Sequence, residues 1–245
     1  CTSCAVGCRV VVQSSRDEIL RYQGVDSDPV NHGWLCDKGR FDFEAVNSDH
    51  RLAEPMLRTD TGLTATTWSS ALTTSAQLIR DAIDAGGPAA IGVLGGARGT
   101  NEDAFAWAQL ASGLGIEHRD AQFGDGLPAS ILGLNRASFD DAANAATVVL
   151  LCGDIKEELP VLYLRLRDAA VEKRSTLVEF APLDTGLSRY AQHAVRHQPG
   201  LAVDAVRDAS DLLAGDDVVV VVGRQNLAES ADETMAALAA VLEIT

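Results

Sequence analysis

Short apolar runs alternate with helical patterns over most of the chain. The runs predict buried strands at residues 89–94, 147–152, 177–181 and 218–222. Apolar side chains recur at helical spacing at residues 68–85, 101–114, 159–170 and 231–242, which predicts four helices. Apolar strands that are separated by helices are typical of a parallel sheet covered on both faces.

The N-terminal residues follow a different pattern. Residues 9–13 and 19–24 read as strands around a polar turn, which predicts a β-hairpin. The pattern changes near residues 55–61. We therefore expect an α/β protein with a small N-terminal domain at residues 1–58. A doubly wound, mostly parallel and incomplete Rossmann-like domain is expected at 59–245. Because the chain begins at Cys1 and ends close to a predicted helix, we expect a piece of a longer polypeptide.

Charge and composition exclude several classes of protein. The 245 residues include 35 acidic and 20 basic side chains, a net charge of −15, and 47% are hydrophobic. That apolar content excludes an intrinsically disordered chain. The acidic balance argues against a nucleic-acid partner and against docking on anionic lipid. No apolar run approaches the ~20 residues that span a bilayer, so we expect no direct membrane insertion.

Four of the five cysteines fall in the first 36 residues, with the spacing C-x2-C-x3-C-x27-C. Disulfides are disfavoured because the first three lie too close together to pair easily and the total is odd. Zinc sites commonly use paired C-x2-C knuckles, whereas three clustered thiolates and one distant thiolate suit a cubane. The spacing favours a [4Fe–4S] cluster on Cys1, Cys4, Cys8 and Cys36, with zinc as the alternative.

Residues beside these ligands also have candidate roles. Gly7 and Gly33 can let the backbone approach a cluster closely. Lys38 and Arg40 can offset its negative charge, although by composition alone a solvated helix start is the better explanation of both residues. His32 is expected to pack near the cluster rather than bind it.

Together, residues 30–41 (VNHGWLCDKGRF) and 51–58 (RLAEPMLR) resemble the iron–sulfur segment of the molybdopterin oxidoreductase superfamily. Residues 95–105 and 152–161 continue the resemblance less sharply. The resemblance implies that Cys1, Cys4, Cys8 and Cys36 carry the cluster. It also implies that Lys38 corresponds to the lysine lying between cluster and pterin in catalytic members.

Within that superfamily, the run CDKGRF is most similar to the large iron–sulfur subunits of bacterial respiratory complex I. This implies an electron-transferring subunit of an NADH:quinone oxidoreductase. Its partners would be other peripheral-arm subunits, on the cytoplasmic face of the bacterial inner membrane. In that branch the cluster lies off the main electron path, so a structural role stays compatible.

The alternative is a catalytic molybdopterin enzyme, such as a formate dehydrogenase alpha subunit. Its metal ligand is expected between residues 124 and 138, which contain no cysteine. Asp125, Ser130 and Ser138 are the substitutes available, and we expect no bound molybdopterin.

Three further features carry no predicted chemistry. The glycine-rich loop at residues 92–99 lacks both nucleotide-binding motifs, and Thr100 with Asp103 forms a predicted capping box. Cys152 follows a buried strand and is expected to act as a small apolar side chain. His193 and His197 lie four residues apart without a third ligand.

Overall fold

The computed structural model describes residues 1–26, 30–96, 99–121, 126–224 and 229–245. They fall into two compact units, one formed by residues 1–46 with 125–245 and the other by residues 47–124. These units are defined by contact and do not coincide with the predicted division into residues 1–58 and 59–245, which stays a prediction.

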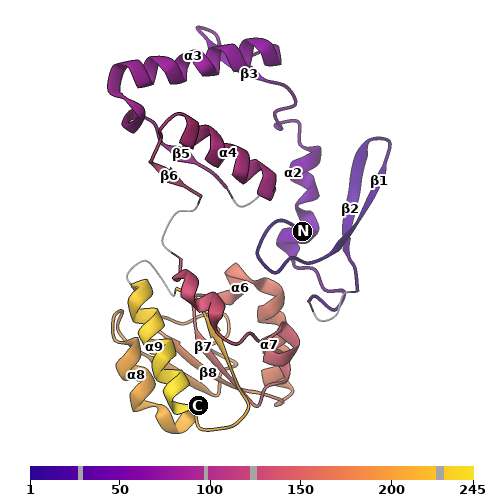
Figure 1. The fold of residues 1–245 in the computed structure, drawn as a ribbon. Coiled ribbons are helices and arrows are strands. Elements are labelled where there is room, and N and C mark those ends of the chain that lie inside the picture. The colour runs from indigo at the N-terminus through magenta and orange to yellow at the C-terminus, as the bar shows by residue number, and fades with distance from the viewer. Residues whose placement is uncertain (27–29, 97–98, 122–125, 225–228) are drawn as a thin grey trace. The chain divides into compact units, whose positions relative to one another are not determined.

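A four-stranded parallel sheet forms the core of the first unit (Figure 1), in the order β10-β7-β8-β9. Its strands are β7 (Thr147–Leu151), β8 (Thr176–Ala181), β9 (His193–Arg196) and β10 (Val218–Val222). Three of them confirm predicted strands, and β9 contains the stretch that begins at His193. The predicted α/β class with a parallel sheet is therefore confirmed.

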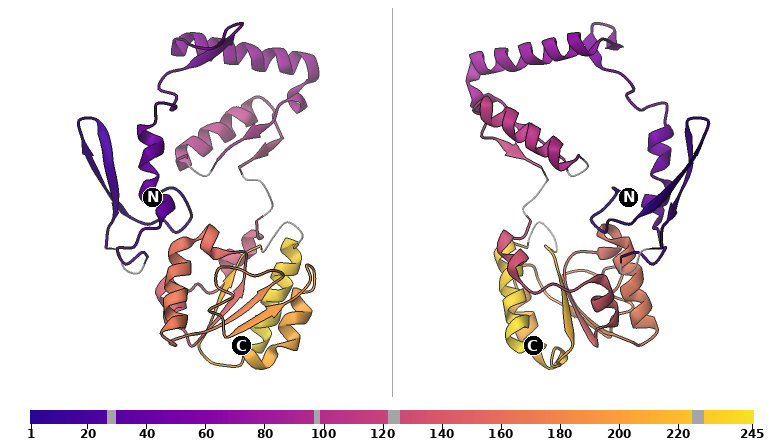
Figure 2. Two further views of the ribbon diagram at one scale, coloured as in Figure 1. Left: turned by 180° about the vertical axis from the view of Figure 1, so that it is seen from behind. Right: turned by 45° about the vertical axis from the view of Figure 1, so that its right-hand side comes forward.

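Helices cover both faces of this sheet, as Figure 2 shows. They are α5 (Phe139–Asn144), α6 (Ile155–Glu158), α7 (Pro160–Val171), α8 (Ala202–Asp208) and α9 (Ala231–Ile244), with short 3-10 turns at Ala129–Gly133 and Ser210–Leu212. Along β7, Val148 and Leu150 pack with α7, while Val149 and Leu151 pack with α8 and α9. Successive strand side chains point to opposite faces, so a strand that is covered on both sides is apolar throughout.

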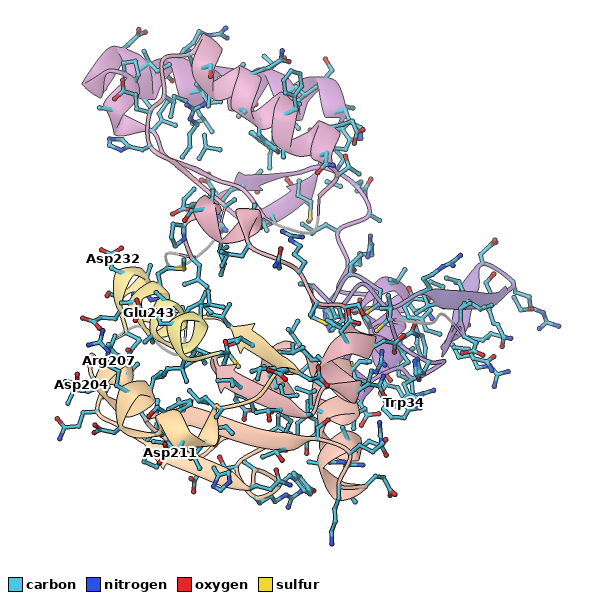
Figure 3. The ribbon with its side chains drawn as sticks, turned by 60° about the horizontal axis from the view of Figure 1, so that its bottom comes forward. Trp34, Asp204, Arg207, Asp211, Asp232 and Glu243 are labelled. Atoms are coloured by element: carbon cyan, nitrogen blue, oxygen red, sulfur yellow. The ribbon has the colours of Figure 1, made fainter. Side chains whose placement is uncertain are left out.

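Charged side chains lie on the outer surfaces of α8 and α9. Asp204, Arg207, Asp232 and Glu243 lie on these helices with partly or fully exposed side chains, and Asp211 is exposed just beyond α8 (Figure 3). The two helices bury apolar side chains on the sheet, and their exposed positions carry these charges together with Leu242, which is 51% exposed.

The N-terminal residues form the predicted hairpin. β1 (Val10–Ser15) pairs antiparallel with β2 (Glu18–Gly24), and the register shifts between Gln13 and Ser14. Arg16 and Asp17 form the turn with φ of 53° and 65°. Positive φ at both central residues matches the right-handed twist of the strands. Two short helices follow, α1 (Asp37–Phe41) and α2 (Phe43–Asn47).

The second unit contains two small sheets and two longer helices. Its elements are β3 (Met56–Thr59), β4 (Gly62–Ala65), α3 (Trp68–Gly86), a 3-10 turn (Pro88–Ala90), β5 (Val93–Leu94), α4 (Asn101–Gly113) and β6 (Arg119–Asp120). Helix α4 begins with the predicted capping box, because Thr100 Oγ1 accepts from Asp103 N at 3.2 Å and Asp103 Oδ2 accepts from Thr100 N at 2.8 Å.

The predicted buried strand at residues 89–94 is wrong. Pro88–Ala90 forms a 3-10 turn, and only Val93 and Leu94 are extended. They pair with the two residues of β6, and the Leu94 side chain is 73% exposed. Gly92 and Gly95 flank Val93 and Leu94 and interrupt the apolar run. The partner strand β6 is short, so the ladder contains two residue pairs.

No helix among the described residues is long and apolar enough to cross a membrane.

Cys152 lies at the carboxyl end of β7 and is only 7% exposed. Burial raises the pKa of its thiol to about 12, and the negative charges of Glu158, Glu179 and Asp154 act in the same direction. A thiol reacts as its thiolate, so this environment makes Cys152 inert. The prediction that it acts as an apolar core residue agrees with this burial.

We expect Leu166→Ala to lower the free energy of unfolding by about 2–5 kcal/mol, because it removes a fully buried side chain from between α7 and the sheet. Urea denaturation followed by circular dichroism measures this change. Leu183 is 75% exposed, so Leu183→Ala is the matched control, expected to change stability by less than ~0.5 kcal/mol. Equal effects of the two variants would contradict the described core.

The environment of Cys152 predicts that iodoacetamide does not alkylate this residue in the folded protein near pH ~8, where ordinary thiols react. A moderate rise in pH will not change this, because the thiol pKa is about 12. Peptide mass spectrometry with and without urea measures the modification, which we expect only in urea. Rapid labelling of the native protein would show that this end of β7 is open to solvent.

Candidate iron–sulfur site

The first three cysteines lie in a closed loop ahead of β1. The backbone nitrogen of Cys1 donates to the carbonyl of Cys8 at 2.7 Å, which joins the two ends of the loop. Gly7 has a φ of 71°, in the left-handed region that glycine adopts without strain. Cys8 is 4% exposed and packs with Val6 and Leu35. Local hydrogen bonding and a glycine turn therefore bring these thiols together.

The fourth cysteine reaches this loop through the return of the hairpin and the start of α1. Cys36 is the N-cap residue of α1, and its carbonyl accepts from the backbone nitrogen of Arg40 at 2.9 Å. The Arg40 guanidinium also donates to the Leu35 carbonyl at 3.2 Å. The residues around Cys36 are thus held by the first turn of a helix.

Cys1 and Cys4 pack against the same apolar cluster as Cys8. The pKa of the Cys8 thiol is raised, first by burial and then by the negative charges of Cys4 and Cys36. Thiols repel one another as thiolates, so each benefits from bound metal, which stabilises the deprotonated form. All five cysteines are free thiols.

Cys1 lies against α1 at Gly39. A Cβ atom on Gly39 would lie 2.8 Å from the Cys1 Sγ and 3.1 Å from Leu35 Cδ1. A larger residue here would require the Cys1 or Leu35 side chain to move, a constraint that sequence reasoning did not identify. A Cβ atom at Gly7 or Gly33, in contrast, would meet no close neighbour among the described residues. These two glycines contribute positive φ values of 71° and 74° instead.

These residues fit an iron–sulfur cluster chemically. The available donors are four thiols, the ligand type that iron–sulfur clusters use. Ser3 lies between Cys1 and Cys4 in the sequence. Its Oγ atom is buried and has no hydrogen-bond partner among the described residues. In the part of the chain that the structure describes, no three His, Cys, Asp or Glu side chains are arranged to hold a single metal ion.

Apolar side chains from the α/β sheet region complete the surroundings. Val161 at the start of α7 is 1% exposed and packs in one cluster with Val6, Cys8 and Leu35. Phe139 and Leu159 pack against the same cluster. The cysteine loop is therefore seated on α7, which shields the thiols from water on that side.

Lys38, the predicted neighbour of the cluster, contacts α6. Its Nζ donates to the Glu157 carbonyl at 2.8 Å and to Glu157 Oε2 at 3.1 Å. Both side chains are more than half exposed, so the ion pair itself contributes little stability. Its effect is to direct Lys38 toward the helix that follows β7.

The other predicted candidates have separate roles. Ser138 caps α5, with its Oγ accepting from Asp141 N at 3.1 Å and donating to Asp141 Oδ2 at 2.7 Å. Ser130 lies in a 3-10 turn, and Asp125 lies outside the described residues. His193 lies on β9, and the Nδ1 atom of His197 is 2.9 Å from the Gln198 carbonyl.

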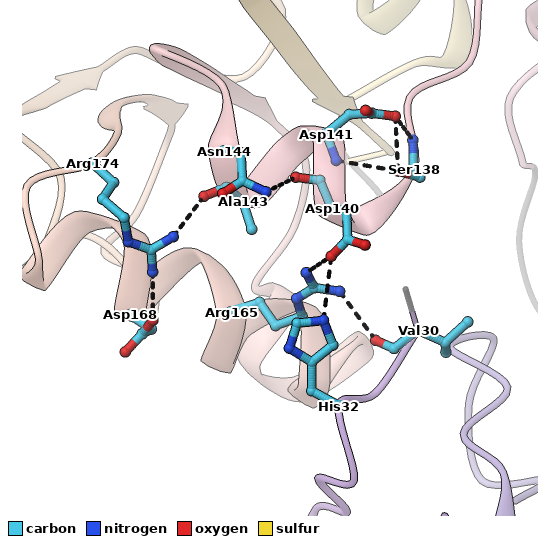
Figure 4. A network of polar contacts seen from close by, with 10 residues as sticks. All are labelled: Val30, His32, Ser138, Asp140, Asp141, Ala143, Asn144, Arg165, Asp168 and Arg174. Carbon is cyan, nitrogen blue, oxygen red and sulfur yellow. Dashed lines mark hydrogen bonds and ion pairs between the residues drawn. The ribbon is translucent and has the colours of Figure 1, made fainter. Parts of the chain in front are cut away.

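Sequence reasoning also missed Asp140 and Arg165. Arg165 is 5% exposed on α7 and forms an ion pair with Asp140 of α5 (Figure 4). One signal was present, because Arg165 lies on the helix face that buries Leu162 and Leu166. A charge on a buried face requires a partner, but the sequence does not say which one.

Two family models match the chain. The molybdopterin oxidoreductase Fe4S4 domain matches residues 1–48, and molybdopterin oxidoreductase matches residues 51–231. The fold alone is similar to acetylene hydratase from Pelobacter acetylenicus, with a TM-score of 0.62 and 16% identity over 83% of this chain and 29% of that chain.

Three curated relatives are similar in sequence. The G subunit of NADH-quinone oxidoreductase from Mycobacterium tuberculosis is 34% identical over 92% of this chain. The NADPH-Fe(3+) oxidoreductase alpha subunit of Geobacter sulfurreducens is 32% identical over 82%, and the assimilatory nitrate reductase of Haloferax mediterranei is 30% identical over 82%. The chain spans 30%, 24% and 29% of their respective lengths. With both family models matched in succession, the chain belongs to the molybdopterin oxidoreductase family and carries its Fe4S4 domain.

Proposed function

We propose that the chain is a fragment of the G subunit of an NADH-quinone oxidoreductase, respiratory complex I. It carries a [4Fe–4S] cluster on Cys1, Cys4, Cys8 and Cys36 and has no pterin catalysis of its own. The observation that carries this proposal is the packing of Cys1, Cys4 and Cys8 around one apolar cluster that includes Leu35, the residue next to Cys36. The similarity to the G subunit of Mycobacterium tuberculosis over 92% of this chain supports it.

The chain's own residues would hold and tune the cluster. When bound, a [4Fe–4S] group supplies one-electron transfer. The four thiolates would each hold one iron, and Val6, Leu35 and Val161 would limit the access of water to them. Ser3 Oγ is the hydroxyl available to a cluster sulfur. Hydrogen bonds and solvent exclusion of this kind set the reduction potential of such clusters.

Two features favour electron transfer over pterin catalysis. Residues 124–138 offer no cysteine as a metal ligand, and the hydroxyl of Ser138 is engaged in the cap of α5. Lys38, which corresponds to the lysine between cluster and pterin in catalytic members, is engaged by Glu157. The Ser138 contact is part of a helix cap, whereas the exposed Lys38 pair is weak, so the missing cysteine carries most of this argument.

A second candidate function is a catalytic molybdopterin-dependent oxidoreductase, of the nitrate reductase or formate dehydrogenase alpha subunit type. The match to the molybdopterin oxidoreductase model over residues 51–231 favours it. So does the similarity to the assimilatory nitrate reductase of Haloferax mediterranei. The two candidates share the cluster and differ in bound molybdenum.

Location and partners follow from the first proposal. A segment of the G subunit would contact other subunits of the peripheral arm of complex I. Its place would be the cytoplasmic face of the bacterial inner membrane, held there through those partners. Relatives named as subunits of NADH-quinone oxidoreductase in Mycobacterium tuberculosis, Thermus thermophilus and Streptomyces coelicolor support a place among other subunits.

We expect Cys36→Ser to remove or degrade the cluster in the full-length protein, because Cys36 is the only ligand outside the eight-residue loop. Iron and zinc are measured by elemental analysis after anaerobic purification, and the reduced cluster by electron paramagnetic resonance. The expected loss is about four irons per chain. Cys152→Ala is the matched control and should keep its iron, because the Cys152 thiol is buried beside the sheet. Iron that is unchanged in Cys36→Ser, or zinc in the wild type, would contradict the cluster assignment.

The second prediction separates the two candidates. We expect no stoichiometric molybdenum or tungsten in the full-length protein, since the expected ligand segment contains no cysteine. The same elemental analysis measures both metals, beside a catalytic nitrate reductase purified in parallel as the positive control. One molybdenum or tungsten per chain would favour the catalytic oxidoreductase.

A further inference from the structure

The turn that precedes Cys36 has a demanding backbone conformation. His32 and Gly33 have φ values of 47° and 74°, so two successive residues are left-handed. The turn closes through the Trp34 nitrogen, which donates to the Asn31 carbonyl at 2.6 Å, and through Asn31 Nδ2, which donates to the Trp34 carbonyl at 2.9 Å. Residues other than glycine adopt this region uncommonly, although histidine does so more often than most, and contacts outside the turn can offset its cost.

One side of this turn is held by the hairpin. A Cβ atom on Gly24, at the end of β2, would lie 2.4 Å from the Gly33 carbonyl oxygen. The backbone of the turn therefore lies directly against the backbone of the strand, and only glycine allows this approach. This contact limits movement of the turn toward the hairpin.

The other side is held by two charged residues of the α/β region. Arg165 Nη2 donates a hydrogen bond to the Asp140 carboxylate. Arg165 Nη1 donates to the Val30 carbonyl at 3.4 Å. His32 Nε2 lies 3.3 Å from the same Asp140 oxygen. Figure 4 shows these groups converging from α5, α7 and the turn. The Arg165 guanidinium of α7 thus holds the turn in two ways. It binds the Val30 backbone directly, and it binds Asp140, which in turn contacts the His32 side chain.

Burial makes this link specific. The Arg165 side chain is only 4% exposed, and a buried guanidinium requires a charged partner. The hydrogen bond from Arg165 lowers the pKa of Asp140, so the carboxyl remains ionised. The planar fork of arginine can reach two acceptors at fixed angles, whereas the point charge of lysine cannot reproduce this geometry.

We propose that Asp140 and Arg165 are positioning residues for the cluster, which fix residues 30–34 and thereby the place of Cys36. This inference rests on the proposed function, because it assigns the two residues a role toward the [4Fe–4S] group. The turn ends two residues before Cys36, and the buried Leu35 connects them. Groups that orient a metal ligand from outside commonly change metal affinity about 10–100-fold when they are removed.

The chain offers a matched control on the same helix. Asp168 of α7 accepts from Arg174 Nη2 at 2.5 Å, and Arg174 Nη1 donates to the Ala143 carbonyl at 3.2 Å. This pair also joins an aspartate to an arginine, but its side chains are 50% and 43% exposed, and in the network of Figure 4 it contacts no residue of the turn. Asp168→Asn therefore removes an equal charge without touching the cluster segment.

The experiment compares full-length wild type, Asp140→Asn, Arg165→Lys and Asp168→Asn. Arg165→Lys keeps the net charge and changes only the geometry of the donor. Iron content is measured at isolation. The rate of iron release to a chelator is followed by absorbance. The reduced cluster is characterised by its electron paramagnetic resonance spectrum and its midpoint potential. We expect Asp140→Asn and Arg165→Lys each to release iron about tenfold faster, with altered resonance lines. Asp168→Asn should behave as wild type.

His32→Asn keeps the test decisive if either charged variant does not fold. Asparagine tolerates the left-handed conformation, so this change removes the imidazole contact while keeping the turn. It should also release iron faster than wild type.

Three results would overturn the positioning role. In the first, release rates and resonance lines of the Asp140, Arg165 and His32 variants equal those of wild type. In the second, Asp168→Asn shows the same changes as Asp140→Asn. In the third, Asp140→Asn shifts the potential while Arg165→Lys does not alter the cluster, so the effect is one of charge alone. A wild-type protein without iron would instead overturn the proposed function.

Discussion

The proposed cluster depends on one constraint, the return of a single distant cysteine to a loop that already holds three. Cys1, Cys4 and Cys8 meet because they are neighbours in sequence and one glycine turn closes their loop. Cys36 must cross 27 residues to join them. Closing a loop of that length costs conformational entropy, which specific contacts along the way must offset. The hairpin, the strained turn and helix α1 supply those contacts.

Helix α7 connects this constraint to the rest of the unit. Leu162, Leu166 and Ala170 of α7 lie in the core beside the parallel sheet. Val161 of the same helix packs with Cys8 and Leu35, and Arg165 is linked to the turn. Helix α7 therefore packs against the core with one part of its surface and against Cys8 and Leu35 with another. Loosening of α7 would consequently affect both the sheet and the proposed cluster.

The cysteines show how environment determines the chemistry of one residue type. Cys152 is enclosed by the sheet and acidic side chains, which hold its thiol in the neutral form with a pKa of about 12. Cys8 is also buried, but it shares its surroundings with other thiols that can be neutralised together by metal. The same burial thus produces an inert core residue in one place and a candidate ligand in the other.

The sequence by itself determined the elements whose signals are local. Val148 to Leu151 read as a strand covered on both faces because every position is apolar, and Thr100 with Asp103 predicted a helix start that the structure contains. The four-cysteine spacing indicated the candidate ligands, and the family resemblance was confirmed by the match over residues 1–48 and 51–231.

Only the tertiary structure decided which distant residues meet. The apolar run at residues 89–94 failed as a buried strand, because a strand needs a partner of comparable length and its partner has two residues. The clearance at Gly39 and the pairing of Arg165 with Asp140 were also invisible in sequence. Local patterns report the conformation of a segment, whereas close approach and ion pairing depend on the packing of segments far apart in the chain.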